Sequence, residues 1–126
     1  MGDFFLVDPV KKFQVNGEAW KILPAVATLV VGTNKLVLAA ITGKVIRVMG
    51  WNASTSGAVG SFFLKSASAG TAITNVVVVP AATTGYNEFK PIVDSGYCET
   101  NTGEGLYADV FTTDVYLTIF YIAYTP

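Results

Sequence analysis

Apolar and polar residues alternate with a period of two along most of the chain, as they do in β-strands that bury one face. No window of ten or more residues carries the spacing of an amphipathic helix. Gly, Asn, Thr and Pro, the residues that favour turns, divide the apolar segments. The pattern predicts strands over residues 11–15, 18–23, 25–31, 35–41, 44–51, 58–65, 71–79, 106–111 and 115–124.

Turn residues suggest how these strands are connected. Asn16-Gly17 predicts a two-residue hairpin, and the strands between residues 25 and 51 are interpreted as one antiparallel meander. The run Val76 to Val79 is apolar on both faces, which predicts a central, doubly covered strand, whereas residues 81–96 are interpreted as loop-rich. We therefore expect an all-β protein, an antiparallel, jelly-roll-like β-sandwich in one domain over residues 11–126.

The last predicted strand is apolar on both faces. Val115, Leu117, Ile119, Tyr121 and Ala123 share one face, which we expect to fill the core. The opposite face carries the predicted oligomer interface, formed by Tyr116, Phe120, Ile122 and Tyr124. The alternative cover for that face is a loop of the same chain, such as residues 81–96.

Composition supports a covered exterior. Hydrophobic residues make up 52% of the chain and charged residues only 13%, about half the usual charged fraction. A folded monomer of 13.4 kDa exposes roughly 6,500 Å², which leaves about one charge for each 380 Å². We expect other protein subunits to cover much of this surface.

Charge is divided unevenly along the chain. Residues 1–65 hold seven basic and three acidic groups, whereas residues 66–126 hold one basic and six acidic groups. The basic part of one copy could therefore face the acidic part of another, unless folding interleaves the two parts. Scattered lysines and an acidic pI argue against a nucleic-acid partner.

Candidate catalytic chemistry is sparse. The chain has no histidine, the usual general base and metal ligand, so we expect no enzyme, no metal and no cofactor. A pair of carboxylates such as Glu99 and Glu104 is the alternative for hydrolysis, although solvated loop acids are commoner. The single cysteine, Cys98, is interpreted as an inert apolar residue, and neither a signal peptide nor a membrane span is predicted.

Two further groups of residues are candidates for contact with other molecules. Residues 1–10 are predicted to form an N-terminal arm whose Phe4, Phe5, Leu6 and Val7 contact the surface of another subunit, or else to form a first strand of the sheet. Arg47 and Trp51 are predicted to share one strand face, where they would form a platform for a sugar ring, unless Trp51 belongs to the core.

Two motifs carry a resemblance to a known group of proteins. The first runs Gly43-Lys44-Val45-Ile46-Arg47-Val48-Met49-Gly50-Trp51. The second runs from Gly96-Tyr97-Cys98-Glu99-Thr100 through Gly103-Glu104-Gly105-Leu106 to the strand that ends in residues 121–124. Together they resemble small β-sandwich virion proteins of tailed bacteriophages, over roughly residues 25–126, with residues 1–24 outside the pattern.

The resemblance implies a non-enzymatic virion component, assembled in the host cytoplasm. Its implied role is that of a capsid decoration, or cement, protein that forms homotrimers and contacts the major capsid protein. The charge and the lack of a long apolar segment predict no membrane or nucleic-acid partner. The alternative is a receptor-binding or carbohydrate-binding module of a tail fibre or head fibre. No catalytic residue is implied, because the motifs are structural.

Overall fold

The computed structural model describes residues 14–15, 18–19, 21–81, 86–89 and 98–126, of which 14–15, 18–19 and 86–89 are described by their backbone alone. In this part of the chain all helices and strands that form are β-strands, and there is no helix long and apolar enough to cross a membrane. The strands are β1 (Gln14–Val15), β2 (Glu18–Ala19), β3 (Leu23–Leu29), β4 (Gly32–Leu38), β5 (Val45–Thr55), β6 (Gly60–Ser66), β7 (Val77–Val79), β8 (Tyr86–Phe89), β9 (Cys98–Glu99), β10 (Leu106–Phe111) and β11 (Val115–Tyr124).

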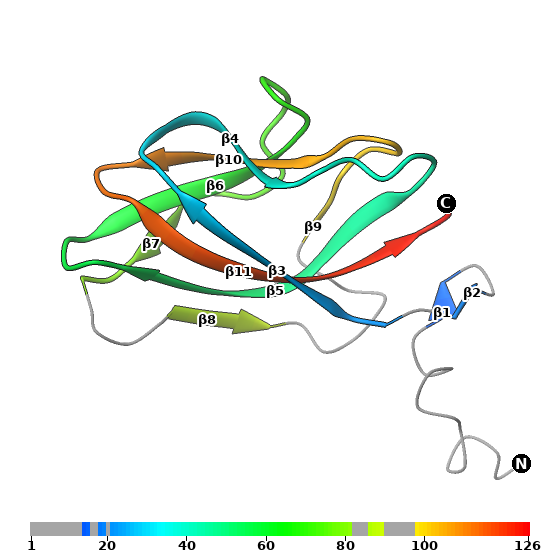
Figure 1. Ribbon diagram of the computed structural model, residues 1–126, viewed down its shortest axis with the longest axis horizontal. Coiled ribbons are helices and arrows are strands. Elements are labelled where there is room, and N and C mark those ends of the chain that lie inside the picture. Colours follow the sequence, from blue (N-terminus) through cyan, green and yellow to red (C-terminus); the bar gives the residue numbers. More distant parts are fainter. Residues whose placement is uncertain (1–13, 16–17, 20, 82–85, 90–97) are drawn as a thin grey trace, which may run out of the picture.

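Eight of these strands form two antiparallel sheets that pack face to face (Figure 1). We name each sheet after the strand that comes last in it along the chain. The β11 sheet has the order β3-β11-β5-β8, and the β10 sheet has the order β4-β10-β6-β7. Short β9 also pairs with β5. Successive strands of the eight pass from one sheet to the other at every connection except β6 to β7, which is the jelly-roll arrangement.

The jelly-roll-like sandwich predicted from the sequence is therefore confirmed, but the predicted meander is wrong. β3 and β5 belong to the β11 sheet, whereas β4, between them in sequence, belongs to the β10 sheet. Period-two alternation shows that a segment has one buried face, but it does not show in which of two facing sheets that segment lies. The pairing of Gln14 with Ala19 and of Val15 with Glu18 confirms the predicted first hairpin.

The main core lies between the two sheets. Ile119 from β11 and Phe62 and Leu64 from β6 are fully buried there. Trp51 of β5 packs edge-on against Phe62 with a centroid distance of 5.9 Å. Burial of each such side chain contributes about 1.5–3 kcal/mol, so this core is the main source of stability for a domain that has no disulfide.

A β-bulge interrupts β5 where it pairs with β11. Phe120 lies opposite Gly50, whereas Tyr121 lies opposite Val48, so Met49 is an extra residue on β5. Before the bulge Val48 points into the core, and after it Trp51 does. The face on which each β5 side chain lies is therefore shifted by one residue past the bulge.

Two other predictions need correction. Val76 to Val79 does not form a central strand: β7 is the three-residue edge of the β10 sheet, with Val76 56% and Val78 59% exposed. Val77 and Val79 do pack in the core, so buried and exposed positions alternate along the run, and the exposed positions, Val76 and Val78, are apolar. The segment interpreted as loop-rich contains an additional strand, β8, at the edge of the β11 sheet.

Candidate interaction surface

Charged residues are sparse on the surface of the chain. Its accessible area is 6675 Å², close to the expected value, which leaves about one charged residue for each 390 Å². Ten large hydrophobic residues in the described ranges are at least two-fifths exposed. They are Leu23, Val26, Val30, Val31, Leu36, Val59, Val76, Val78, Phe111 and Tyr116.

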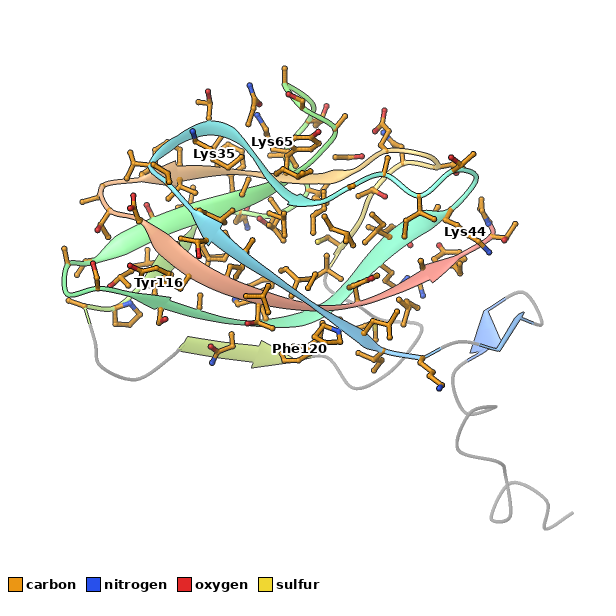
Figure 2. The ribbon with its side chains drawn as sticks, in the orientation of Figure 1. Lys35, Lys44, Lys65, Tyr116 and Phe120 are labelled. Atoms are coloured by element: carbon orange, nitrogen blue, oxygen red, sulfur yellow. The ribbon has the colours of Figure 1, made fainter. Side chains whose placement is uncertain are left out.

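One uncharged band crosses the outside of the β11 sheet. On β11, Tyr116, Thr118 and Phe120 lie outward and are paired in register with three residues of β3. We call these six residues the outer row: Pro24, Val26, Thr28, Tyr116, Thr118 and Phe120. None of them is charged. Figure 2 shows Tyr116 and Phe120 on the opposite side of the sandwich from Lys35 and Lys65.

The faces predicted for the last strand are confirmed, but its outer face has two parts. Tyr116 is 43% exposed and Phe120 is partly exposed. Ile122 and Tyr124 instead are buried within their own chain, in a small cluster with Val45 and Met49. Of the four residues predicted for the oligomer interface, only Tyr116 and Phe120 present accessible surface to a neighbour.

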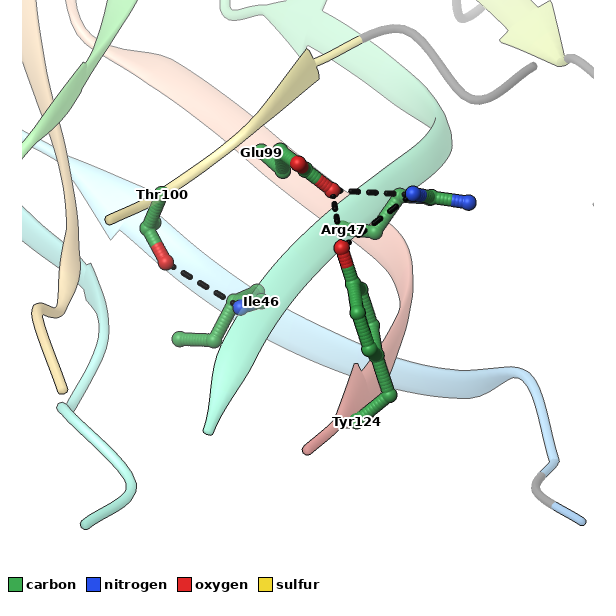
Figure 3. A network of polar contacts seen from close by, with 5 residues as sticks. All are labelled: Ile46, Arg47, Glu99, Thr100 and Tyr124. Atoms are coloured by element: carbon green, nitrogen blue, oxygen red, sulfur yellow. Dashed lines mark hydrogen bonds and ion pairs between the residues drawn. The ribbon is translucent and has the colours of Figure 1, made fainter. Parts of the chain in front are cut away.

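Tyr124, a member of this cluster, also takes part in a polar network with Arg47 and Glu99 (Figure 3). Arg47 Nε donates to Glu99 Oε2 at 3.0 Å, and the Tyr124 hydroxyl donates to the same oxygen at 2.7 Å. The Arg47 guanidinium also lies over the Tyr124 ring, 4.9 Å from its centroid. Burial, together with the hydrogen bond to Glu99, raises the pKa of Tyr124. Beside the network, Thr100 Oγ1 accepts from the backbone N–H of Ile46 at 3.1 Å.

The predicted sugar platform of Arg47 and Trp51 does not form. Trp51 is 3% exposed and packs in the main core, whereas Arg47 lies on the other face of the sheet, beside Glu99. The bulge at Met49 explains the error, because it places two residues four apart in sequence on opposite faces. The alternative interpretation, that Trp51 belongs to the core, is the correct one.

The outside of the β10 sheet is mixed in character. Phe63 and Phe111 contact each other with a centroid distance of 5.8 Å, and Val78 is exposed near them on β7. Beside these rings, Lys65 Nζ lies 2.9 Å from Asp109 Oδ1. The pairs Lys65–Asp109 and Arg47–Glu99 each join the basic part of the sequence to the acidic part, so folding interleaves charge at both places.

The two carboxylates considered for hydrolysis belong to separate networks. Glu99 is held by Arg47 and Tyr124, whereas Glu104 Oε1 accepts from Ser66 Oγ at 2.6 Å and from Asn101 Nδ2 at 3.0 Å. These hydrogen bonds lower the pKa of Glu104. Within the described ranges, no three acidic or cysteine side chains gather in a way that could hold a metal ion.

The sequence interpretation missed the contribution of β3. Its Val26 is 80% exposed and belongs to the outer row. The signal was present as a run without charge, from Ile22 to Asn34 between Lys21 and Lys35, but it was interpreted only as ordinary strands. The predicted contact residues Phe4, Phe5, Leu6 and Val7 lie outside the described residues.

Comparison of the sequence with protein-family models and curated proteins does not assign the chain to a family. No protein-family model matches the chain, and no curated protein sequence is similar to it.

Proposed function

We propose that this chain is a structural component of a tailed-bacteriophage particle, a capsid decoration protein that oligomerises on the head surface and stabilises it. The observation that carries the proposal is the outer row, an uncharged band with four exposed and two partly exposed residues on a sandwich with few charges anywhere. Exposed apolar surface of this kind is typical of protein–protein contacts.

The sequence motifs that resemble virion proteins occupy structural positions. Gly43 and Gly103 have φ angles of +73° and +75°, which favour glycine. Gly43 lies just before β5, and Gly103 lies in the turn before β10. Gly50 lies at the bulge of β5. Residues that shape a scaffold suit a role in assembly, and the resemblance implies a homotrimer bound to the major capsid protein.

In this proposal Tyr116 and Phe120 form the seam between copies, and residues 4–7 contact the capsid or a neighbouring copy. A protein that binds only the assembled shell stabilises it by mass action, since binding is lost when the shell subunits separate. The effect grows with the logarithm of the free protein concentration above its Kd.

The test is co-sedimentation of the purified full-length protein with intact capsids, followed by heating of decorated and undecorated capsids. We expect saturable binding and a higher temperature of capsid disruption when the protein is bound. Val78→Asp, on the opposite sheet, is the control for an outer-row variant such as Tyr116→Asp. Absence of capsid binding, or selective binding to a glycan array, would reject the decoration role.

A further inference from the structure

Apart from Pro24, β3 lacks the features that normally protect the edge of a sheet. Four of the eight sandwich strands lie at the ends of their sheets, β3 and three others: β4 includes Lys35 and two register shifts against β10, β7 has three residues, and β8 has four residues including Glu88. β3 instead pairs with β11 over seven residues without a register shift, and it contains no charged residue. Short length, charge and irregularity are the usual means by which an edge strand avoids pairing with another chain.

Exposed apolar side chains also concentrate at this edge. Val26 is 80% exposed, the highest value among the exposed large hydrophobic residues of the described ranges. Leu23, Val30 and Val31, at 44%, 54% and 42%, lie on the same strand or in the turn that follows it. Four of the ten such residues therefore lie within nine consecutive positions, which marks β3 as a contact site.

We propose that β3 pairs antiparallel with β3 of a second copy, about a two-fold axis at Val26, so that the two β11 sheets become one continuous sheet. The sequence around Val26 suits this symmetry. Ala25 and Ala27 flank it, and Pro24 lies opposite Thr28 of the partner subunit. The contact does not depend on the proposed function, because it forms between free copies with or without a capsid.

Pro24 weakens this pairing but does not prevent it. Proline is tolerated in a sheet where its nitrogen faces away from the neighbouring strand, here β11, so at the open edge Pro24 cannot donate to the carbonyl of Thr28 of the partner subunit and each copy lacks one hydrogen bond. The backbone groups of Val26 and Thr28 then face the open edge as well, because they follow at intervals of two. Val26 can exchange two hydrogen bonds with Val26 of the partner subunit, and the Thr28 N–H can donate to the carbonyl of Pro24 of the partner subunit.

The absence of charge favours a second copy over a different partner. At a two-fold axis each residue meets its own equivalent or a near neighbour, so a charged residue there would face a like charge. The run from Ile22 to Asn34 avoids this repulsion throughout. A different protein partner would normally be selected by complementary charge, for which this edge offers no group.

Pairing of the two β3 strands would place two outer rows next to each other and so double the uncharged area available for contact with other proteins. Both outer rows would lie on one face of the joined sheet, with the two Val26 side chains side by side at the axis. A trimer seam at Tyr116 and Phe120 uses the face of the sheet, whereas this contact uses its backbone edge. The two contacts are therefore separable by mutation.

The first test compares Val26→Lys with the matched control Val78→Lys, which also changes an exposed valine on an edge strand. The mass of each full-length protein is measured by light scattering at about 10–100 μM, a range that suits interfaces of moderate affinity. We expect Val26→Lys to halve the mass of the wild-type species and Val78→Lys to leave it unchanged. Thermal unfolding of both variants checks that each is folded.

The second test does not depend on a charge being tolerated. Val26→Cys in a Cys98→Ala background places two thiols at a hydrogen-bonded antiparallel pair, where the Cα atoms lie about 5.5 Å apart, within disulfide range. We expect rapid oxidation to a covalent dimer, and none for Val78→Cys in the same background.

Equal masses together with no cross-link at position 26 would overturn the proposal. It would also be overturned if Val26→Lys abolished capsid binding without changing the mass of the free protein, because the edge would then bind a capsid strand. If wild type does not bind capsids but the Val26→Cys variant forms its covalent dimer, the decoration role is rejected and the pairing of β3 stands.

Discussion

Lys65 Nζ lies 2.9 Å from Asp109 Oδ1, although the two side chains are only 8% and 12% exposed. The same ammonium donates to the side-chain oxygen of Asn34, and the Asp109 carboxylate accepts from the backbone N–H of Asn34 at 2.9 Å. The group thus joins β6, β10 and β4, and the backbone N–H of Ala69 adds the neighbouring loop. Each charge in it has a partner, as buried charges require.

Removal of one partner should therefore destabilise the protein strongly. Lys65→Met leaves the Asp109 carboxylate buried without its cation, and we expect a loss of about 3–5 kcal/mol in the free energy of unfolding. Urea denaturation monitored by tryptophan fluorescence measures it. The double variant Lys65→Met with Asp109→Leu should recover most of that loss. A loss below about 1 kcal/mol for the single variant would contradict this account of the pair.

The same carboxylate makes stability depend on pH. Burial raises the pKa of Asp109, but the hydrogen bond from Asn34 and the interaction with Lys65 outweigh it, so the net pKa is below the ordinary value of 3.8. A lowered folded-state pKa gives stability that is present above the unfolded pKa and is lost as pH falls through the folded pKa. We expect the stability difference between wild type and Asp109→Asn to be constant near neutral pH and to shrink below pH 3.8. A difference that stays constant in acid would disprove the linkage.

Tyr124 should contribute more to stability than Tyr116. Tyr124→Phe removes the donor to Glu99 and the acceptor for Arg47, so we expect a loss of about 1 kcal/mol. Tyr116→Phe, at an exposed tyrosine, is the matched control and should change stability by less than about 0.5 kcal/mol. Equal effects of the two changes in thermal or urea unfolding would show that the network adds nothing.

Cys98 should react slowly in the folded protein. Burial, followed by the charge of Glu99, raises the pKa of its thiol from 9.0 to about 12. Because the thiolate is the reactive species, the thiolate fraction at pH 8 falls about a thousandfold. We expect labelling by iodoacetamide to be slow for native protein and fast in urea, as measured by mass spectrometry. Rapid labelling of native protein would show that the thiol is accessible and ionised.

Phe120 tests the seam between copies. A carboxylate in the outer row would have to lose its water at a seam, so Phe120→Asp should reduce the assembly to one or two copies or cause aggregation. Val59→Asp, in the exposed loop between β5 and β6, is the control and should leave the mass unchanged. Light scattering that shows wild type to be monomeric at micromolar concentration would remove the basis for a seam.

Sequence patterning was sufficient for the sandwich and for the faces of β11. Val115, Leu117, Ile119 and Tyr121 lie in the core as their alternation predicted, because no bulge interrupts β11 itself. Patterning could not identify the bulge in β5, because Met49 and Gly50 fit either register. The pairing of Trp51 with Arg47 failed for that reason.

The candidate surface was predictable only in part. Tyr116 and Phe120 were identified from the strand pattern, but Ile122 and Tyr124 are buried by residues that pattern alone does not bring near them, such as Val45 and Met49. Val26 was not identified, because an alternating apolar strand does not show whether it lies at the centre or the edge of a sheet. That distinction depends on long-range pairing, which local periodicity does not encode.

β11 is the last of the eight sandwich strands in chain order, yet it lies between β3 and β5, two of the earliest. During synthesis on the ribosome, β3 and β5 cannot complete their sheet until β11 has emerged from the exit tunnel. Until then the nascent chain carries uncovered strand edges, including the uncharged β3, which makes it prone to aggregate. Its yield in cells should therefore depend on chaperones that bind nascent chains.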